Sequence, residues 1–208
     1  MRADLVLSFP PTPLIRFNSI SLSYNVNSRF TNALIGEIHD GLQAEDFMVM
    51  LDTCYAYWAH PLLVPVLLLD MLMFSLEGEI VDNITLIQGI ETTVSNLPSL
   101  GMDARPLAER ENVTSLLTNL HDTIKQAIKL LDAARWMQKA AHMLLSIGGD
   151  LNKNAELQNT LEMKREWAEI KEFLEDLIRI TEYLVPDPEM TQQRCQSQID
   201  IVRPRIDL

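Results

Sequence analysis

The sequence predicts a mainly α protein: a long antiparallel helix bundle or coiled coil with a small N-terminal β-hairpin appendage. Its composition, with 47% hydrophobic and 22% charged residues, is typical of a folded chain. Apolar residues recur at helical spacing through most of the 208 residues, and they alternate with polar residues only near the N-terminus. We therefore expect a loose lead and small β element over residues 1–41 and a helical bundle domain over residues 42–208.

The first 41 residues predict a hairpin that follows an irregular lead. Residues 1–13 hold a short apolar patch and three prolines, and the patch is too short for the apolar region of a signal peptide. From Ile20 to Val26, apolar residues alternate with serine and asparagine, as in a half-buried strand. A second, weaker strand is expected over residues 30–38.

The stretch from His60 to Leu76 is the most apolar part of the chain, and the expected helical domain is organised around it. A membrane span needs about 20 apolar residues, whereas Asp70 interrupts a run of at most 16 between Pro61 and Leu76. No Lys or Arg flanks the run to set an orientation in a membrane. We therefore expect the buried start of a long helix. Asp70 should lie near the bundle edge or beside a polar partner, because an unpaired buried carboxylate is costly.

Helical spacing predicts the remaining elements. A preceding amphipathic helix places six apolar residues on one face: Phe47, Met50, Leu51, Cys54, Tyr55 and Trp58. Long helices are expected from Pro61 to about residue 97, from about 107 to 147 with an end at Gly148-Gly149-Asp150, and from about 155 to 185. A short polar helix over 189–202 needs something to dock against. Three tryptophans at helical positions are expected to anchor the core: Trp58, Trp136 and Trp167.

The helix expected over residues 155–185 has the clearest heptad pattern. Its apolar positions alternate spacings of four and three, as in the seam of a coiled coil. We therefore predict an interface to a helical protein partner or to a second copy of the chain. The residues assigned to it are Met163, Trp167, Ile170, Leu174, Leu177 and Leu184.

Candidate chemistry is sparse. Glu77, Glu79 and Asp82 are the densest acidic group beside the apolar run, and carboxylate oxygens suit Mg²⁺, so they are candidate metal ligands; a solvated helix face explains the same residues. His39, His60, His121 and His142 match no metal or catalytic pattern, and no nucleophile or nucleotide-binding motif occurs. We therefore predict a protein that is not an enzyme and has no cofactor apart from the candidate Mg²⁺.

The distribution of charge excludes one class of partner. The formal net charge is −12, and no Lys or Arg occurs between Thr31 and Ala104. Because nucleic-acid affinity depends on Lys and Arg, we predict no nucleic-acid binding. The acidic half suits divalent cations or a basic partner, although such a surface also serves solubility. Cys54 and Cys195 are far apart and form no disulfide pattern, which favours a cytoplasmic location.

The run from His60 to Asp70, followed by three long helices, resembles the soluble region of fungal CorA-like divalent-cation transport proteins. The resemblance extends from about Tyr55 to Val202, and the segment from Arg194 to Ile199 looks like the family's helix that leads to the membrane. It implies a cytosolic helical region, pentameric assembly and Mg²⁺ transport through two transmembrane helices. The sequence lacks that pair, and Gly101-Met102-Asp103 differs from the family's Gly-Met-Asn signature in its third residue and context.

Two functions follow as expectations. The first is a CorA-like cytosolic domain, truncated or degenerate, that cannot transport by itself and has a regulatory or assembly role; a membrane association would come through a missing C-terminal region or a full-length relative. The second is a helical protein-protein interaction or scaffold module unrelated to ion transport.

Overall fold

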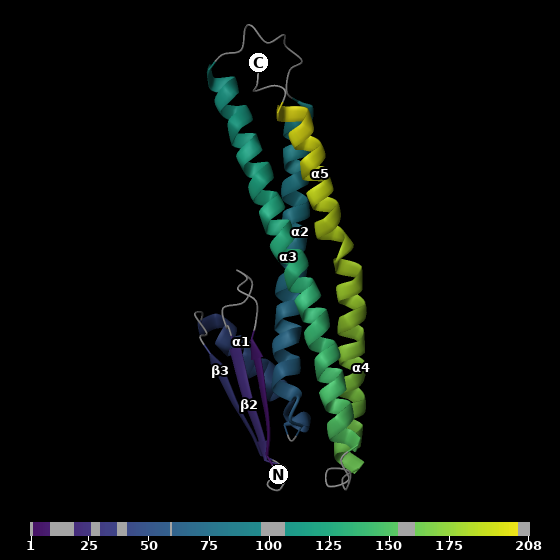
Figure 1. Cartoon of the computed structure of the whole chain (residues 1–208). Coiled ribbons are helices and arrows are strands. Elements are labelled where there is room, and N and C mark those ends of the chain that lie inside the picture. The colour runs from purple at the N-terminus through teal and green to yellow at the C-terminus, as the bar shows by residue number, and fades with distance from the viewer. Residues whose placement is uncertain are drawn as a thin grey trace. The chain divides into compact units, whose positions relative to one another are not determined.

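The computed structural model describes residues 2–8, 19–25, 30–36, 41–58, 60–96, 107–153 and 161–203. Within them the fold is mainly helical, with four long packed helices and a small three-stranded antiparallel sheet, so the predicted fold class is confirmed (Figure 1). The elements are β1 (Arg2–Ser8), β2 (Ser19–Asn25), β3 (Phe30–Gly36), α1 (Gly41–Thr53), η1 (Tyr55–Tyr57), α2 (Leu63–Ser95), α3 (Leu107–Lys153), α4 (Leu161–Leu184) and α5 (Pro186–Val202).

The chain forms two compact units, and neither begins or ends at residue 41. Unit 1 comprises Met1–Leu76 and Ala133–Glu182, and unit 2 comprises Glu77–Asp132 and Tyr183–Leu208. The division therefore falls within α2, α3 and α4. The expected domain boundary between residues 41 and 42 stays a prediction.

The sheet of unit 1 has one strand more than the predicted hairpin. Its order is β1-β2-β3, and β1 pairs with β2 in a register that sets Leu5 opposite Leu22. The expectation of an irregular lead was therefore wrong for Arg2–Ser8, because the three prolines follow this strand and leave its ladder of backbone hydrogen bonds intact. The alternation expected in the central strand is confirmed, since Ile20, Leu22 and Tyr24 are buried.

The apolar run forms the core of unit 1. Leu68, Leu69, Leu72 and Leu76 are fully buried on α2, which confirms the prediction of a core helix. Asp70 is only half-buried, as a carboxylate at a bundle edge should be. None of the described helices is both long and apolar enough to cross a membrane.

An alanine-rich face of α3 is buried in the same unit. Its small side chains leave room for large ones on neighbouring elements, which is how a close-packed interior avoids both voids and overlap. The buried residues of this face are Ala133, Ala134, Met137, Ala140, Ala141 and Leu144.

The amphipathic helix before the run ends earlier than predicted. The amide of Cys54 donates to the carbonyls of both Met50 and Leu51, at 3.1 and 3.2 Å, and this marks the change from α1 to the tighter turn of η1. A 3₁₀ turn has fewer residues per turn, so Tyr55 and Trp58 leave the buried face and are exposed. Trp58 is therefore not a core anchor, and its Nε1 donates to the Leu51 carbonyl at 2.7 Å.

Gly148 and Gly149 do not end α3, which continues to Lys153. A Cβ added at Gly148 would overlap the six-membered ring of Trp167 on α4, whereas one at Gly149 would meet nothing within 4 Å. Gly148 therefore stands where the buried Trp167 needs room. This packing explains why the helix continues past two glycines at which the sequence predicted its end. The predicted helix start near residue 155 lies outside the described residues, and α4 begins at Leu161.

Unit 2 has its own core, built by the end of α2, the start of α3 and α5. The last helix docks as expected, since Cys195, Ile199 and Val202 are buried in this cluster. The other members are Ile87, Ile90, Val94, Val113, Leu116 and Leu120. The Arg194 guanidinium also donates two hydrogen bonds to the Glu91 carboxylate, of 2.9 Å from Nε and 2.5 Å from Nη2.

Candidate functional site

The three predicted metal ligands do not form a metal site. Glu79 accepts a hydrogen bond of 2.9 Å from Gln126 Nε2, while Glu77 is half-buried and Asp82 is exposed. Throughout the part of the chain that the structure describes, no group of three His, Cys, Asp or Glu side chains is arranged to hold a metal ion. Glu77, Glu79 and Asp82 are described residues, so the structure gives no geometry on which an Mg²⁺ centre could rest.

The predicted partner seam is mostly inside the molecule. Trp167, Ile170, Leu174 and Leu177 are buried in unit 1, and Met163 and Leu184 are half-buried. The heptad pattern correctly identified an apolar helix face, but this chain covers that face with its own residues. The seam's role as an interface to a partner stays a prediction.

His60 is a structural histidine. It is 4% exposed, and its ring stacks on Trp167 with 6.1 Å between centroids and 9° between planes. The Leu62 amide donates to His60 Nδ1 at 3.2 Å, and burial lowers the pKa of His60 to about 4. The ring is therefore neutral near pH 7. His121 and His142 are exposed, and His39 lies outside the described residues.

A cluster of three polar side chains connects η1 with α4. Tyr57 Oη donates to Glu169, and Arg165 Nε donates to the same carboxylate at 3.2 Å. The hydrogen bond from Tyr57 is the main cause of a lowered pKa at Glu169, and it raises the pKa of Tyr57 in turn. Both groups are held in the states that suit a structural bond, since Glu169 stays ionised and Tyr57 stays protonated.

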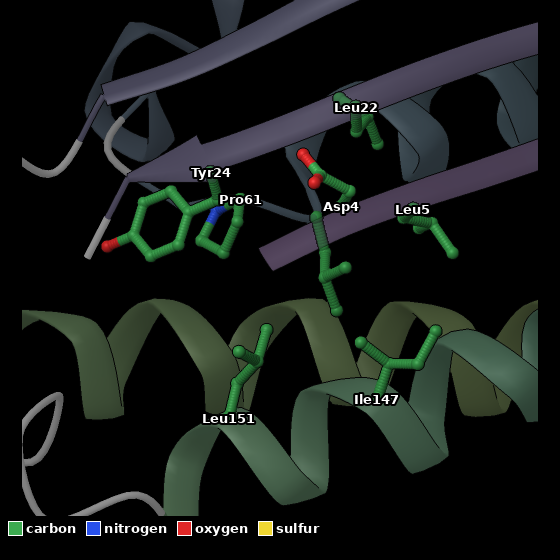
Figure 2. A pocket seen from close by; sticks show the side chains of 8 residues that line it. Asp4, Leu5, Leu22, Tyr24, Pro61, Ile147 and Leu151 are labelled. Atoms are coloured by element: carbon green, nitrogen blue, oxygen red, sulfur yellow. The ribbon is translucent and has the colours of Figure 1, made fainter. Parts of the chain in front are cut away.

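Figure 2 shows a small cavity of unit 1 between strands β1 and β2 and helix α3. Its volume is about 150 Å³, which is below the range of about 300–1,000 Å³ for sites that bind drug-sized molecules. Its lining is mainly apolar: Leu5, Leu22, Pro61, Leu62, Ile147 and Leu151, with Asp4 and Tyr24. Ile147 and Leu151 reach up from α3 towards the strand residues (Figure 2), so within the described part of the chain the cavity is mainly a gap in apolar packing.

A larger opening lies between α1 and α2, and we name it the α1–α2 hollow. Its volume is about 560 Å³. Phe74 is 80% exposed and Val49 is 65% exposed, although both are large apolar side chains. The residues that line the hollow are Asp46, Val49, Met50, Asp70, Met71, Phe74 and Ser75.

The sequence held a signal for this hollow that the prediction did not use. Phe74 was included in the buried run, yet it follows Asp70 by one helical turn, so the two share a face. A half-buried aspartate within an apolar run marks the side of the helix that reaches solvent. The residue four positions later is therefore expected on that side as well.

No model of a known protein family matches the sequence, and no curated protein matches it either. The resemblance to CorA-like transport proteins therefore stays a prediction. The function has to be argued from the surfaces that the described residues form.

Proposed function

We propose that this protein is a non-catalytic helical interaction module that binds an amphipathic helix of another protein in the α1–α2 hollow. The exposure of Phe74 is the observation that carries this function. An aromatic side chain gains about 25 cal/mol for each Å² of apolar surface removed from water, and Phe74, which is 80% exposed, gains only a small part of this within its own chain. A partner that covers Phe74 and Val49 would recover that free energy.

A helix suits the hollow better than a small molecule does. Small-molecule sites enclose most of the ligand, whereas here Phe74 and Val49 protrude beside an open depression. A helix that presents apolar side chains at i, i+3 or i+4, and i+7 can cover protruding and recessed residues together. Met50 and Met71 supply walls that adapt to the shape of the inserted side chain, because methionine is unbranched and flexible.

The hollow offers little for catalysis. Its polar side chains are Asp46, Asp70 and Ser75, and Ser75 Oγ already donates to the Met71 carbonyl at 3.1 Å. Of the lining residues that the structure describes, none is a histidine that could act as a base for that hydroxyl. We therefore assign it to binding.

Selection from a displayed library of helical peptides on the whole chain tests this function. We expect selected peptides to bind the Phe74→Ser variant at least about tenfold more weakly than the natural chain. Tyr183→Ser is the matched control, because Tyr183 is 82% exposed and does not line the hollow. Circular dichroism should show that both variants keep the helical content of the natural chain.

Two results would refute the proposed function. One is a library that yields no peptide whose binding depends on Phe74. The other is a dimer in sedimentation equilibrium that Phe74→Ser dissociates, because the hollow would then hold a second copy of this chain.

A further inference from the structure

We propose that the helix bound in the α1–α2 hollow is basic, with Lys and Arg beside the apolar residues that enter the hollow. This partner chemistry rests on the proposed function and specifies it, because the first identifies a helix as the occupant and the second gives the charge of its polar face. The apolar part of the hollow supplies affinity, and the charged part selects among apolar helices.

Among the described residues that line the hollow, the charged side chains are Asp46 and Asp70, and both are acidic. Asp46 lies on α1 and is exposed, while Asp70 lies on α2 and is half-buried. Glu45 and Asp52 are further exposed acids on α1. Of the described residues that line the hollow, none is basic. An approaching Lys or Arg therefore meets carboxylates on both helices.

The acidic character extends beyond the hollow itself. From Thr31 to Ala104 the sequence contains no Lys or Arg, and this range includes all of α1, η1 and α2. The long aliphatic stems of Lys and Arg can also lie along apolar side chains such as Phe74, while their charged ends reach the carboxylates that line the hollow. The apolar side chains and the acidic charge of the hollow thus favour the same kind of partner.

Other occupants fit the charge less well. In a symmetric contact between two copies of this chain, acidic walls would face acidic walls, which repels. Nucleic acids and anionic lipid surfaces are disfavoured for the same reason. A basic amphipathic helix is the occupant that suits both the apolar side chains and the carboxylates that line the hollow.

Three synthetic helical peptides of about four turns test the charge. They share one apolar face of Leu, Met and Phe, and their remaining positions are Lys, Gln or Glu. We expect fluorescence anisotropy at about 0.05 M salt to give the Lys peptide at least about tenfold higher affinity than the Glu peptide, and the difference should shrink at about 0.3 M salt because exposed charges are screened.

Two variants locate the effect. Asp46→Asn should weaken the Lys peptide by about twofold to threefold and reduce its salt dependence. Glu172→Gln removes one negative charge from an exposed position on α4 that does not line the hollow, so it should leave binding unchanged. Equal effects of the two variants would mean that net charge, rather than the hollow, attracts the peptide, and would refute the inference.

The outcomes separate the inference from the proposed function. If all three peptides bind equally and Phe74→Ser weakens each of them, the hollow binds helices without selecting their charge, and only the inference fails. If none of the three binds and the peptide library also yields no ligand, both fail.

Discussion

The adjacent glycines of α3 provide a test of the packing in unit 1. Replacing Gly with Ala inside a helix adds about 1 kcal/mol of stability when the new methyl group meets nothing. Gly149 is such a position, since an added Cβ has no neighbour within 4 Å. We expect Gly149→Ala to raise the melting temperature by about 2–4 °C for a chain of this size.

At Gly148 the sign should reverse. The new Cβ would overlap Cζ3, Cη2 and Cε3 of Trp167, and that ring is buried and stacked on His60, so it has little freedom to move. Overpacking costs about 1–3 kcal/mol, and three overlapping ring atoms place this site at the upper end of the range. After the gain of about 1 kcal/mol in helix propensity, Gly148→Ala should destabilise the fold by about 2 kcal/mol.

Thermal unfolding followed by far-ultraviolet circular dichroism measures both variants against the natural chain. The two substitutions are chemically identical and one position apart, so each is the control for the other. If Gly148→Ala were as stable as Gly149→Ala, Trp167 would not occupy the space beside Gly148, and the explanation for the continuous α3 would be wrong.

Three further outcomes are expected. The pKa of His60 is about 4 in the fold and 6.5 in the unfolded chain, so the unfolded state binds a proton first as the pH falls. The free energy of unfolding should therefore drop by about 3 kcal/mol between about pH 6.5 and pH 4. Urea titrations of the His60→Gln variant should lack this part of the loss. Asn83 is 2% exposed, its Oδ1 has no hydrogen-bond partner, and its Nδ2 reaches the Thr123 carbonyl only at 3.5 Å. Asn83→Leu should therefore raise the free energy of unfolding, measured by urea titration, by about 1 kcal/mol. A decrease would contradict the idea that the hydrogen bonds of this amide are poorly satisfied. Glu91→Gln removes the negative charge that pairs with Arg194, so it should lower the free energy of unfolding by about 1 kcal/mol at pH 7. The variant should cause no such loss at a pH where Glu91 is protonated. An equal loss at both pH values would show that the charge is not the cause.

Periodicity predicted most of the helical fold because it reports which face of an element must leave water. The buried leucines of α2 and the buried seam of α4 follow directly from such spacing. What periodicity does not report is the side chain that lies opposite. Trp167 beside Gly148 is the clearest case, since two glycines are a reasonable helix stop until a ring on another helix needs the space beside one of them.

The missed strand has a different physical cause. The apolar residues of β1 form a short consecutive patch without clear alternation, and prolines follow them, so the local sequence suggested a lead without regular structure. A strand is stabilised by pairing with its neighbour more than by its own propensity, and here β2 supplies the partner through a seven-residue register. The prediction considered the segment alone, whereas its conformation depends on a segment more than ten residues away.

The burial of the predicted α4 seam has a related explanation. A heptad seam shows that a helix needs a partner, but it does not show which molecule supplies one, and unit 1 itself covers Trp167, Ile170 and Leu174. The α1–α2 hollow has the opposite character, since Phe74 is apolar and remains in water beside the half-buried carboxylate of Asp70. An apolar residue that shares a helix face with a required charge therefore identifies free surface better than a long apolar pattern does. For this chain that criterion selects Phe74 and Asp70 in place of the α4 seam.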